Sequence, residues 1–147
     1  NFQSGQSTTV TQGGVDPFAN AANNNSGLNL ARGATAQIRT DLVGDPHGPK
    51  TVTEFFNTAA FVQASGHFGT ERPGTVLGPG FQLWDISLIK NIRFAERASL
   101  QLRLESFNAF NHGSPSGIDT NINSGTFGQV NAWHDPRTVQ LGAKIRF

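Results

Sequence analysis

Four histidines are the first candidates for chemistry in this chain, because imidazole can bind a metal ion or transfer a proton near neutral pH. They are His47, His67, His112 and His134, and each lies among the Gly, Pro, Asp or Asn residues that favour loops. None has a second histidine or a carboxylate at the spacing of a metal-binding motif such as HExxH. We therefore expect solvated loop histidines, with no metal site and no cofactor site.

Two carboxylates, Asp85 and Glu105, are a candidate acid–base pair of the kind that hydrolases use. Both lie in segments with the two-residue period of strands, so a place on a polar sheet face explains them better than catalysis. The turn Gly78-Pro79-Gly80 precedes a strand pattern, whereas a phosphate-binding loop precedes a helix. The absence of Cys excludes a thiolate nucleophile and a thiolate zinc site. We expect no enzyme activity.

The composition excludes further classes of protein. The 147 residues include 11 Lys+Arg and 10 Asp+Glu, and this balance argues against nucleic-acid binding through a basic surface. Charged residues make up 14%, well below the ~25% of ordinary soluble domains. Twelve Phe do not fit a disordered chain. The chain contains no Met, which predicts a processed product or a piece of a longer protein.

Apolar and polar side chains alternate with the period of a β-strand at 83–94, 100–105 and 138–147, and each of the three segments that contain these residues is about ten residues long. Ten residues at ~3.3 Å each and a tilt of ~40° rise roughly 25 Å, which is the height of the apolar band of an outer-membrane barrel. The apolar face would then contact lipid and the polar face would line the lumen. The predicted lumen-facing charges are Asp85, Arg93, Arg103, Glu105, Lys144 and Arg146. Lys90 is the exception, since it falls on the apolar face, where its stem must reach toward the periplasmic head groups.

The connections between these segments are unequal in length. A tight turn at residues 95–97 joins the first two, and a loop rich in Asn, Gly and Ser, at about 108–134, joins the last two. Outer-membrane barrels have short periplasmic turns and long extracellular loops. We therefore predict that residues 81–147 form the last three transmembrane strands. Residues 1–80, which are rich in turn residues, would form an extracellular loop region with the tail of a truncated strand at 1–10.

Aromatic residues and the chain end support the same orientation. An aromatic girdle would contain Trp84, Phe107, Phe110 and Trp133 near the outer interface, and Phe94 and Phe147 near the inner one. The last segment is apolar at every second residue up to a terminal aromatic, through Val139, Leu141, Ala143, Ile145 and Phe147. This pattern resembles the C-terminal signal that the outer-membrane barrel assembly machinery reads.

Several strings extend the resemblance to a family. They include Gly78-Pro79-Gly80-Phe81, Phe107-Asn108-Ala109-Phe110-Asn111-His112 and the terminal Lys144-Ile145-Arg146-Phe147. Together they resemble the C-terminal end of TonB-dependent outer-membrane receptors, of the acidobacterial type with a carboxypeptidase regulatory-like domain. The resemblance implies a plugged barrel of roughly 22 strands that imports a nutrient with energy passed through TonB.

The resemblance also implies a location and a set of partners. The location is the outer membrane of a Gram-negative bacterium. The partners are outer-membrane lipid, the barrel assembly machinery, an unknown small ligand and the TonB complex, which would be contacted by an N-terminal part outside this chain. No nucleic-acid partner is expected.

The predicted fold class is all-β: antiparallel strands form the C-terminal part of a transmembrane β-barrel, and a long, irregular and poorly packed region precedes them. One alternative is a soluble all-β binding module of a secreted adhesin or glycan-binding protein, which would be monomeric without detergent. Another is the end of a porin or autotransporter that does not use TonB.

Overall fold

The computed structural model describes residues 1–13, 15, 17, 38–94 and 96–147 of the chain. The regular structure of these residues consists of β-strands in antiparallel pairs and one short 3-10 turn. They divide into two compact units. The strand unit contains residues 1–3, 81–114 and 134–147, and the loop unit contains residues 4–80 and 115–133. The predicted all-β, antiparallel fold class is confirmed.

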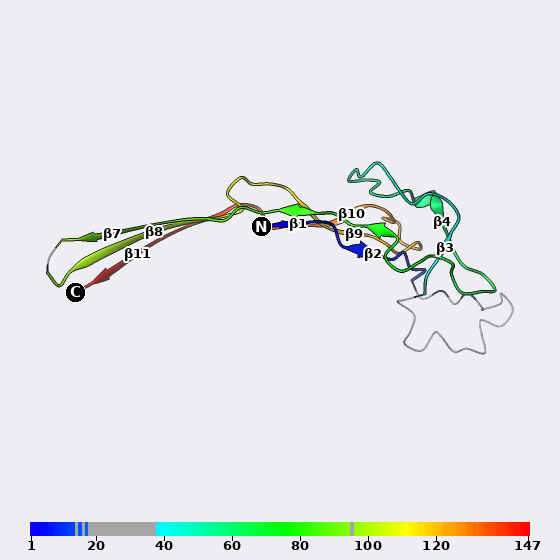
Figure 1. Cartoon of the computed structure of the whole chain (residues 1–147), viewed down its shortest axis with the longest axis horizontal. Helices are drawn as coiled ribbons and strands as arrows, with labels where there is room; N and C mark the ends of the chain where they lie inside the picture. The colour runs from blue at the N-terminus through cyan, green and yellow to red at the C-terminus, as the bar shows by residue number, and fades with distance from the viewer. Residues whose placement is uncertain (14, 16, 18–37, 95) are drawn as a thin grey trace. The chain divides into compact units, whose positions relative to one another are not determined.

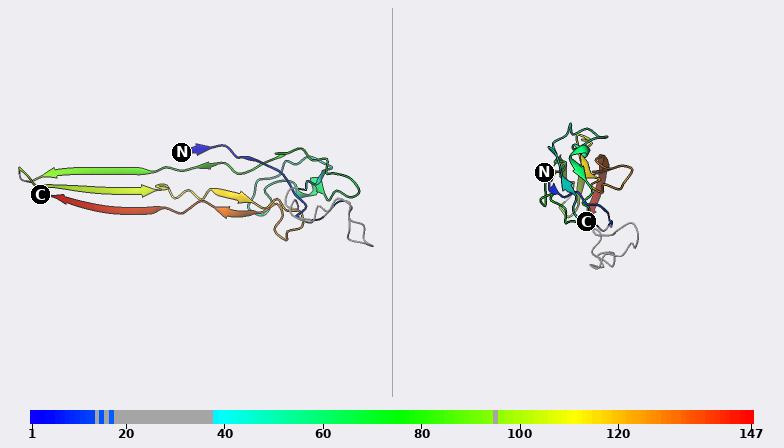
Figure 2. Two further views of the ribbon diagram at one scale, coloured as in Figure 1. Left: turned by 90° about the horizontal axis from the view of Figure 1, so that it is seen from below. Right: turned by 90° about the vertical axis from the view of Figure 1, so that its right-hand side faces the viewer.

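Three long strands dominate the strand unit. They are β7 (Ile86–Arg93), β8 (Ser99–Phe107) and β11 (Thr138–Arg146), which run side by side in Figures 1 and 2. The sheet order is β11-β8-β7, with antiparallel pairing on both sides of β8. A short connection joins β7 to β8, and there the backbone N–H of Phe94 donates to the carbonyl of Ala98 at 3.2 Å. Residue 95 of the predicted turn lies outside the described residues.

The pairing register aligns apolar residues across all three strands. Leu88 of β7 lies opposite Leu104 of β8, and Leu104 lies opposite Leu141 of β11. Four residues further along β7, the row Ile92, Leu100 and Ile145 repeats this arrangement. A slip of one residue would move every side chain of a strand to the opposite face, so the alternation itself fixes the register.

The first residues of the chain also belong to the strand unit. Strand β1 (Phe2–Gln3) pairs antiparallel with β6 (Phe81–Gln82), and the N-terminal ammonium of Asn1 donates to the carbonyl of Leu83 at 2.6 Å. Only part of the predicted strand tail at 1–10 takes this pairing. Strand β2 (Ser7–Thr8) pairs with β5 (Val76–Leu77) in the loop unit.

The loop unit is built from short strand pairs around a common core. Besides β2 and β5, it contains β3 (Asp41–Leu42) paired with β4 (Phe61–Val62), β9 (Pro115–Ile118) paired with β10 (Val130–Trp133), and the 3-10 turn η3 (Thr58–Ala60). Asn57 caps η3, because its side-chain oxygen accepts a hydrogen bond from the backbone N–H of Ala59 at 3.2 Å.

A hydrophobic core lies within this unit, and the expectation of a poorly packed region is therefore wrong for its described part. The ring of Phe56 packs edge-to-face on Phe61 and Phe127, with centroids 5.5 and 5.3 Å apart. The buried members of the core are Val10, Phe55, Phe56, Ala60, Phe61 and Val76. They pack against apolar residues of 115–133, a partner segment that no local period reveals. Residues 18–37 of the predicted loop region lie outside the described residues.

Candidate functional site

The sheet of the strand unit has one apolar face that the described residues leave uncovered. Every residue of β7 and β11 is exposed, and Leu141 keeps 80% of its surface accessible. By strand alternation and register, the apolar positions on this face are Ile86, Leu88, Ile92, Leu100, Leu102, Leu104, Val139, Leu141, Ala143 and Ile145. A contiguous apolar surface of this kind marks a protein or membrane contact. Antiparallel strands with such a face suit contact with lipid.

Five of the six predicted lumen-facing charges lie on the opposite face of the sheet. They are Arg93, Arg103, Glu105, Lys144 and Arg146, as alternation and register place them. The Arg103 guanidinium forms an ion pair with Glu105 along β8, with Nη2 and Oε1 2.9 Å apart. The Arg103 side chain is 54% exposed and the Glu105 side chain 20% exposed, and an ion pair at a solvent-accessible surface of this kind contributes little to stability.

Asp85, the sixth charge, lies before β7 and has a different role. Its Oδ1 accepts a hydrogen bond from the backbone N–H of Asn108 at 3.0 Å. Asp85 therefore fastens the start of one strand to the end of the next, while Glu105 pairs with Arg103. The structure does not bring the two carboxylates into a shared acid–base arrangement.

The predicted girdle residues are divided between the two ends of the sheet and the loop unit. The Trp84 ring lies edge-on to Phe110, with centroids 6.0 Å apart, and to Phe2 at 5.5 Å. Phe94 follows β7 at the opposite end of the sheet, and Trp133 ends β10 in the loop unit. The contact of Phe2 with Trp84 was not predicted from the sequence. It depends on the pairing of residues 2–3 with residues 81–82, which are distant in sequence.

Phe107 and the residues of the terminal strand lie along the pair formed by β8 and β11. Phe107 ends β8 opposite Thr138, on the same face as Glu105 by alternation. The predicted assembly-signal residues of 139–145 lie at alternate positions of β11, and the fully exposed Phe147 follows that strand. Among the described residues β11 pairs with β8 alone, so its other edge is unpaired. Recognition of this strand by assembly machinery stays a prediction.

Asn108 organises the end of the sheet where β8 leaves it. Its side chain is buried, and its backbone adopts φ +48°, which Asn tolerates better than most residues. The amide nitrogen Nδ2 donates to the carbonyls of Asp135 at 3.0 Å and His112 at 3.2 Å, while Oδ1 accepts from the N–H of His112 at 2.9 Å. Asn108 thus joins the end of β8 to the segment that leads into β11.

A hollow of about 410 Å³ adjoins this junction. It is lined by Leu83, Asp85, Phe107, Asn108, His134, Asp135, Pro136 and Thr138. The lining contains the carboxylates of Asp85 and Asp135 and the hydroxyl of Thr138, and Asp85 already accepts the backbone N–H of Asn108. The ring of His134, one of the lining residues, packs against the ring of Phe81, with centroids 4.4 Å apart.

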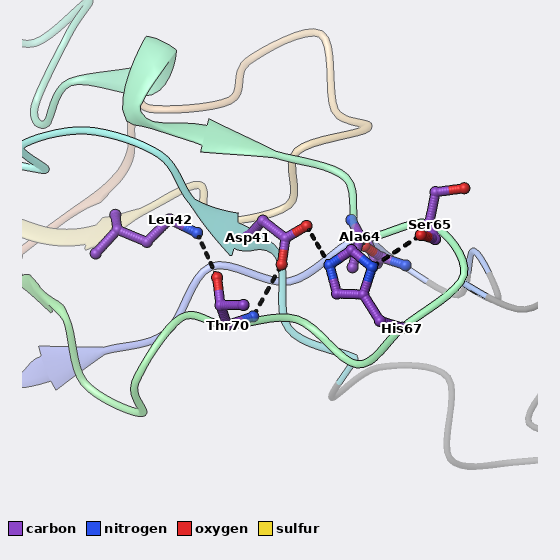
Figure 3. A network of polar contacts seen from close by, with 7 residues as sticks. Asp41, Leu42, Ala64, Ser65, His67 and Thr70 are labelled. Atoms are coloured by element: carbon purple, nitrogen blue, oxygen red, sulfur yellow. Dashed lines mark hydrogen bonds and ion pairs between the residues drawn. The ribbon is translucent and has the colours of Figure 1, made fainter.

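A second polar site lies in the loop unit around His67 (Figure 3). The carboxylate of Asp41 contacts His67 Nε2 through Oδ2 at 2.8 Å and accepts from the N–H of Thr70 through Oδ1 at 2.9 Å. The other ring nitrogen of His67, Nδ1, faces the carbonyl of Ser65 at 2.8 Å. Both nitrogens face acceptors, and only the protonated imidazolium can donate to both.

The Asp41 carboxyl remains ionised over a wide pH range. Burial raises the pKa of Asp41, but the hydrogen bonds from Thr70 and His67 outweigh burial and hold this pKa below its ordinary value of 3.8. A similar pair lies nearby in sequence, where His47 Nδ1 contacts Asp45 Oδ1 at 2.6 Å and the hydrogen bonds from His47 lower the pKa of Asp45. Both histidine side chains are exposed, and each has a carboxylate partner that the sequence analysis did not identify.

Glu71 is a buried carboxyl that sequence analysis missed. Its Oε1 accepts from the backbone N–H of Val10 at 3.0 Å, and its Oε2 accepts from the Thr40 hydroxyl at 3.1 Å. The Arg39 guanidinium donates to the Glu71 backbone carbonyl at 2.8 Å. Burial raises the pKa of Glu71 above its ordinary value of 4.5 despite these hydrogen bonds. No sequence signal marks Glu71, because it lies in a stretch of turn residues without a period.

Neither a metal site nor a membrane-spanning helix occurs among the described residues. No group of three or more His, Asp or Glu side chains in that part of the chain is arranged to hold a metal ion. Within the same residues, no helix is long and apolar enough to cross a membrane.

Comparison with known proteins identifies the family. The outer membrane beta barrel domain matches residues 1–140, a range that includes most of both units. A search of curated proteins and a search of solved structures gave no match. The family match agrees with the antiparallel strands and the uncovered apolar face described above. The chain therefore belongs to the outer membrane beta barrel domain family.

Proposed function

We propose that this chain is the C-terminal part of the barrel of a TonB-dependent outer-membrane receptor, which imports a scarce nutrient with energy passed through TonB. The observation that carries the proposal is the packed core of the loop unit, in which residues far apart in sequence hold long loops in a fixed arrangement. A receptor must capture its ligand before transport, and ordered loops on a rigid scaffold provide a surface for capture. The resemblance of Phe107–His112 and the terminal strand to such receptors supports the same function.

Each part of the chain has a role in this proposal. The apolar face contacts outer-membrane lipid, and the polar face lines the lumen. The last strand is read by the barrel assembly machinery of a Gram-negative bacterium. The small ligand is held by the outer loops, and the TonB complex is contacted through a part of the receptor outside this chain. Catalysis has no place in this function.

Capture by TonB tests the proposal directly. The protein, extracted from outer membranes in a non-ionic detergent, is passed over an immobilised periplasmic domain of TonB from the same organism. Retention is expected, and a soluble periplasmic protein serves as the negative control. Failure to bind, under conditions in which an established TonB-dependent receptor binds, would contradict the proposal.

Liposome swelling separates a receptor from a passive porin. A plugged receptor admits no solute without energy, so proteoliposomes should not swell in small sugars. Rapid swelling would favour a porin. The family match already favours a membrane barrel over a soluble adhesin or glycan-binding module.

A further inference from the structure

Lys90 is the only charged residue at the apolar-face positions of β7, β8 and β11. It lies opposite Leu102 of β8, which in turn lies opposite Ala143 of β11. Lys90 is exposed, and its ammonium has no hydrogen-bond or ion-pair partner among the described residues. A lone ammonium on a lipid-facing surface is stabilised by an anion, because burial of an unpaired charge is costly.

An apolar hollow of about 470 Å³ lies beside this ammonium. Its lining consists of Lys90, five apolar residues (Leu88, Leu102, Leu104, Leu141 and Ala143), Gly142 and Arg103. Arg103 belongs to the opposite face by alternation and pairs there with Glu105. Ala143 has a short side chain between the larger Leu141 and Ile145 of the same face, so it leaves space over Leu102. The volume falls within the ~300–1,000 Å³ of small-molecule sites, and the lining suits a hydrocarbon chain.

The position of Lys90 along β7 places its charge near the lipid head groups. Phe94, the aromatic residue at this end of the sheet, lies four residues beyond Lys90, or ~13 Å along the strand. At a tilt of ~40° this distance is about 10 Å of depth. A lysine stem directed toward the interface spans much of that depth, with its methylene groups on apolar surface and its ammonium among polar groups.

The same end of the strand unit carries an excess of positive charge. Arg93 and Arg146 lie in one row across the sheet, separated by Ser99. Arg97 and Lys144 are also close to this end in sequence, where Glu96 is the acidic side chain. Arg93, Arg146 and Lys144 lie on the polar face and not beside Lys90, so their attraction for anionic lipid is general rather than part of the Lys90 site.

We propose that Lys90 and the apolar hollow form a binding site for one anionic glycerophospholipid, of the phosphatidylglycerol class. The phosphate contacts the Lys90 ammonium, and one acyl chain lies in the hollow over Leu102 and Ala143. This inference rests on the family of the chain and its strand register, and it is independent of TonB and of any imported ligand.

Native mass spectrometry of the delipidated protein in detergent tests this site. The probe is an equimolar mixture of phosphatidylglycerol and phosphatidylcholine with identical acyl chains. The wild-type protein should retain phosphatidylglycerol preferentially. Lys90→Gln should lower the phosphatidylglycerol-to-phosphatidylcholine ratio about five-fold, which corresponds to ~1 kcal/mol per lysine near anionic lipid. Lys90→Arg should preserve the ratio.

The matched control is Lys144→Gln, which removes the same charge from the polar face of β11. It should leave the lipid ratio within about two-fold of wild type. Equal losses in the two Gln variants would show general electrostatic attraction and overturn the site, as would equal retention of both lipids by the wild type.

A second variant tests the hollow without changing charge. Ala143→Leu should reduce retention of both lipids, because the added methyl groups occupy the hollow; unchanged retention would contradict the placement of the acyl chain. Excess inorganic phosphate should not displace bound phosphatidylglycerol, and displacement would indicate a simple phosphate site. Circular dichroism and heat-modifiable migration on gels establish that each variant is folded before lipid is added.

Discussion

Replacement of Glu71 by Ala should open the loop unit near Val10 and Thr40. The buried carboxylate satisfies the backbone N–H of Val10 and the hydroxyl of Thr40, and both of these residues are fully buried. An unsatisfied buried donor costs ~1–3 kcal/mol, so losing the shared acceptor should cost about 2–5 kcal/mol in local stability. Amide hydrogen exchange in peptides covering Val10, Thr40 and Glu71 should accelerate roughly 30-fold or more.

Glu71→Gln is the matched control, because it keeps the shape of the side chain. Its amide oxygen can still accept from Val10, and the Thr40 hydroxyl can rotate to accept from the amide NH₂. Exchange at neutral pH should therefore stay close to wild type. A Gln variant as labile as the Ala variant would show that the carboxylate charge, rather than the acceptors, holds the segments together.

The pH dependence provides an independent check with a defined sign. The pKa of Glu71 is raised in the folded state, so the folded protein binds this proton more tightly than the unfolded chain does. Its contribution to the unfolding free energy is complete below pH 4.5 and declines as the pH rises through the folded-state pKa. After correction for the intrinsic exchange rate, wild type should lose protection across this window and Glu71→Gln should not. Exchange in Glu71→Ala within two-fold of wild type would refute the reasoning.

Three further predictions concern other described residues. Asn108→Ala should lower the unfolding free energy by about 2–4 kcal/mol. The backbone N–H of His112 and the carbonyl of Asp135 lose their hydrogen-bond partner, and Ala is forced to keep the positive φ of this position. A thermal melt in micelles measures the change, and a loss below about 0.5 kcal/mol would contradict it. Asp41→Asn should speed amide exchange at Thr70 by no more than about five-fold, or ~1 kcal/mol, because the site is partly exposed. The pKa of Asp41 is lowered in the folded state, so the contribution of Asp41 to the unfolding free energy is complete above pH 3.8 and is lost as the pH falls through the folded-state pKa. If exchange at Thr70 depends on acid pH in the same way in the Asn variant and in wild type, this contribution is contradicted. Leu141→Arg should destabilise the membrane-inserted protein by roughly 2–4 kcal/mol, whereas Gln140→Arg on the opposite face should be close to neutral. Equal effects in denaturant titrations would contradict the assignment of faces, and a larger cost for Gln140→Arg would reverse it.

The long strands were predictable from sequence because their signal is local. Alternation over ten residues specifies both the strand and its buried or lipid-facing side, and the matched rows Leu88, Leu104 and Leu141 then fix the register. The loop unit was not predictable in the same way. Its core forms only when Phe56 meets Phe127, residues 71 positions apart in the sequence, and neither lies in a periodic segment.

The candidate site residues show the same division. Charges within strands, such as Arg103 and Lys144, follow the face that alternation assigns to them. Charged residues outside the strands do not, because their hydrogen-bond partners depend on the tertiary fold. Asp85 binds a backbone N–H of the next strand's end, and His67 meets an Asp that lies 26 residues away.

The string Phe107–His112 gains a structural explanation from these contacts. Asn108 and Asn111 both adopt positive φ, and the N–H of Asn111 donates to the carbonyl of Asn108 at 2.8 Å, so the chain turns sharply as it leaves β8. The Asn111 side chain then accepts from the backbone N–H of Arg137 at 3.1 Å, just before β11 begins. Asn suits both positions because it tolerates this backbone conformation and carries an amide that can bridge to another segment. The string therefore specifies how the chain turns at the end of β8 and how it is joined to the segment that leads into β11.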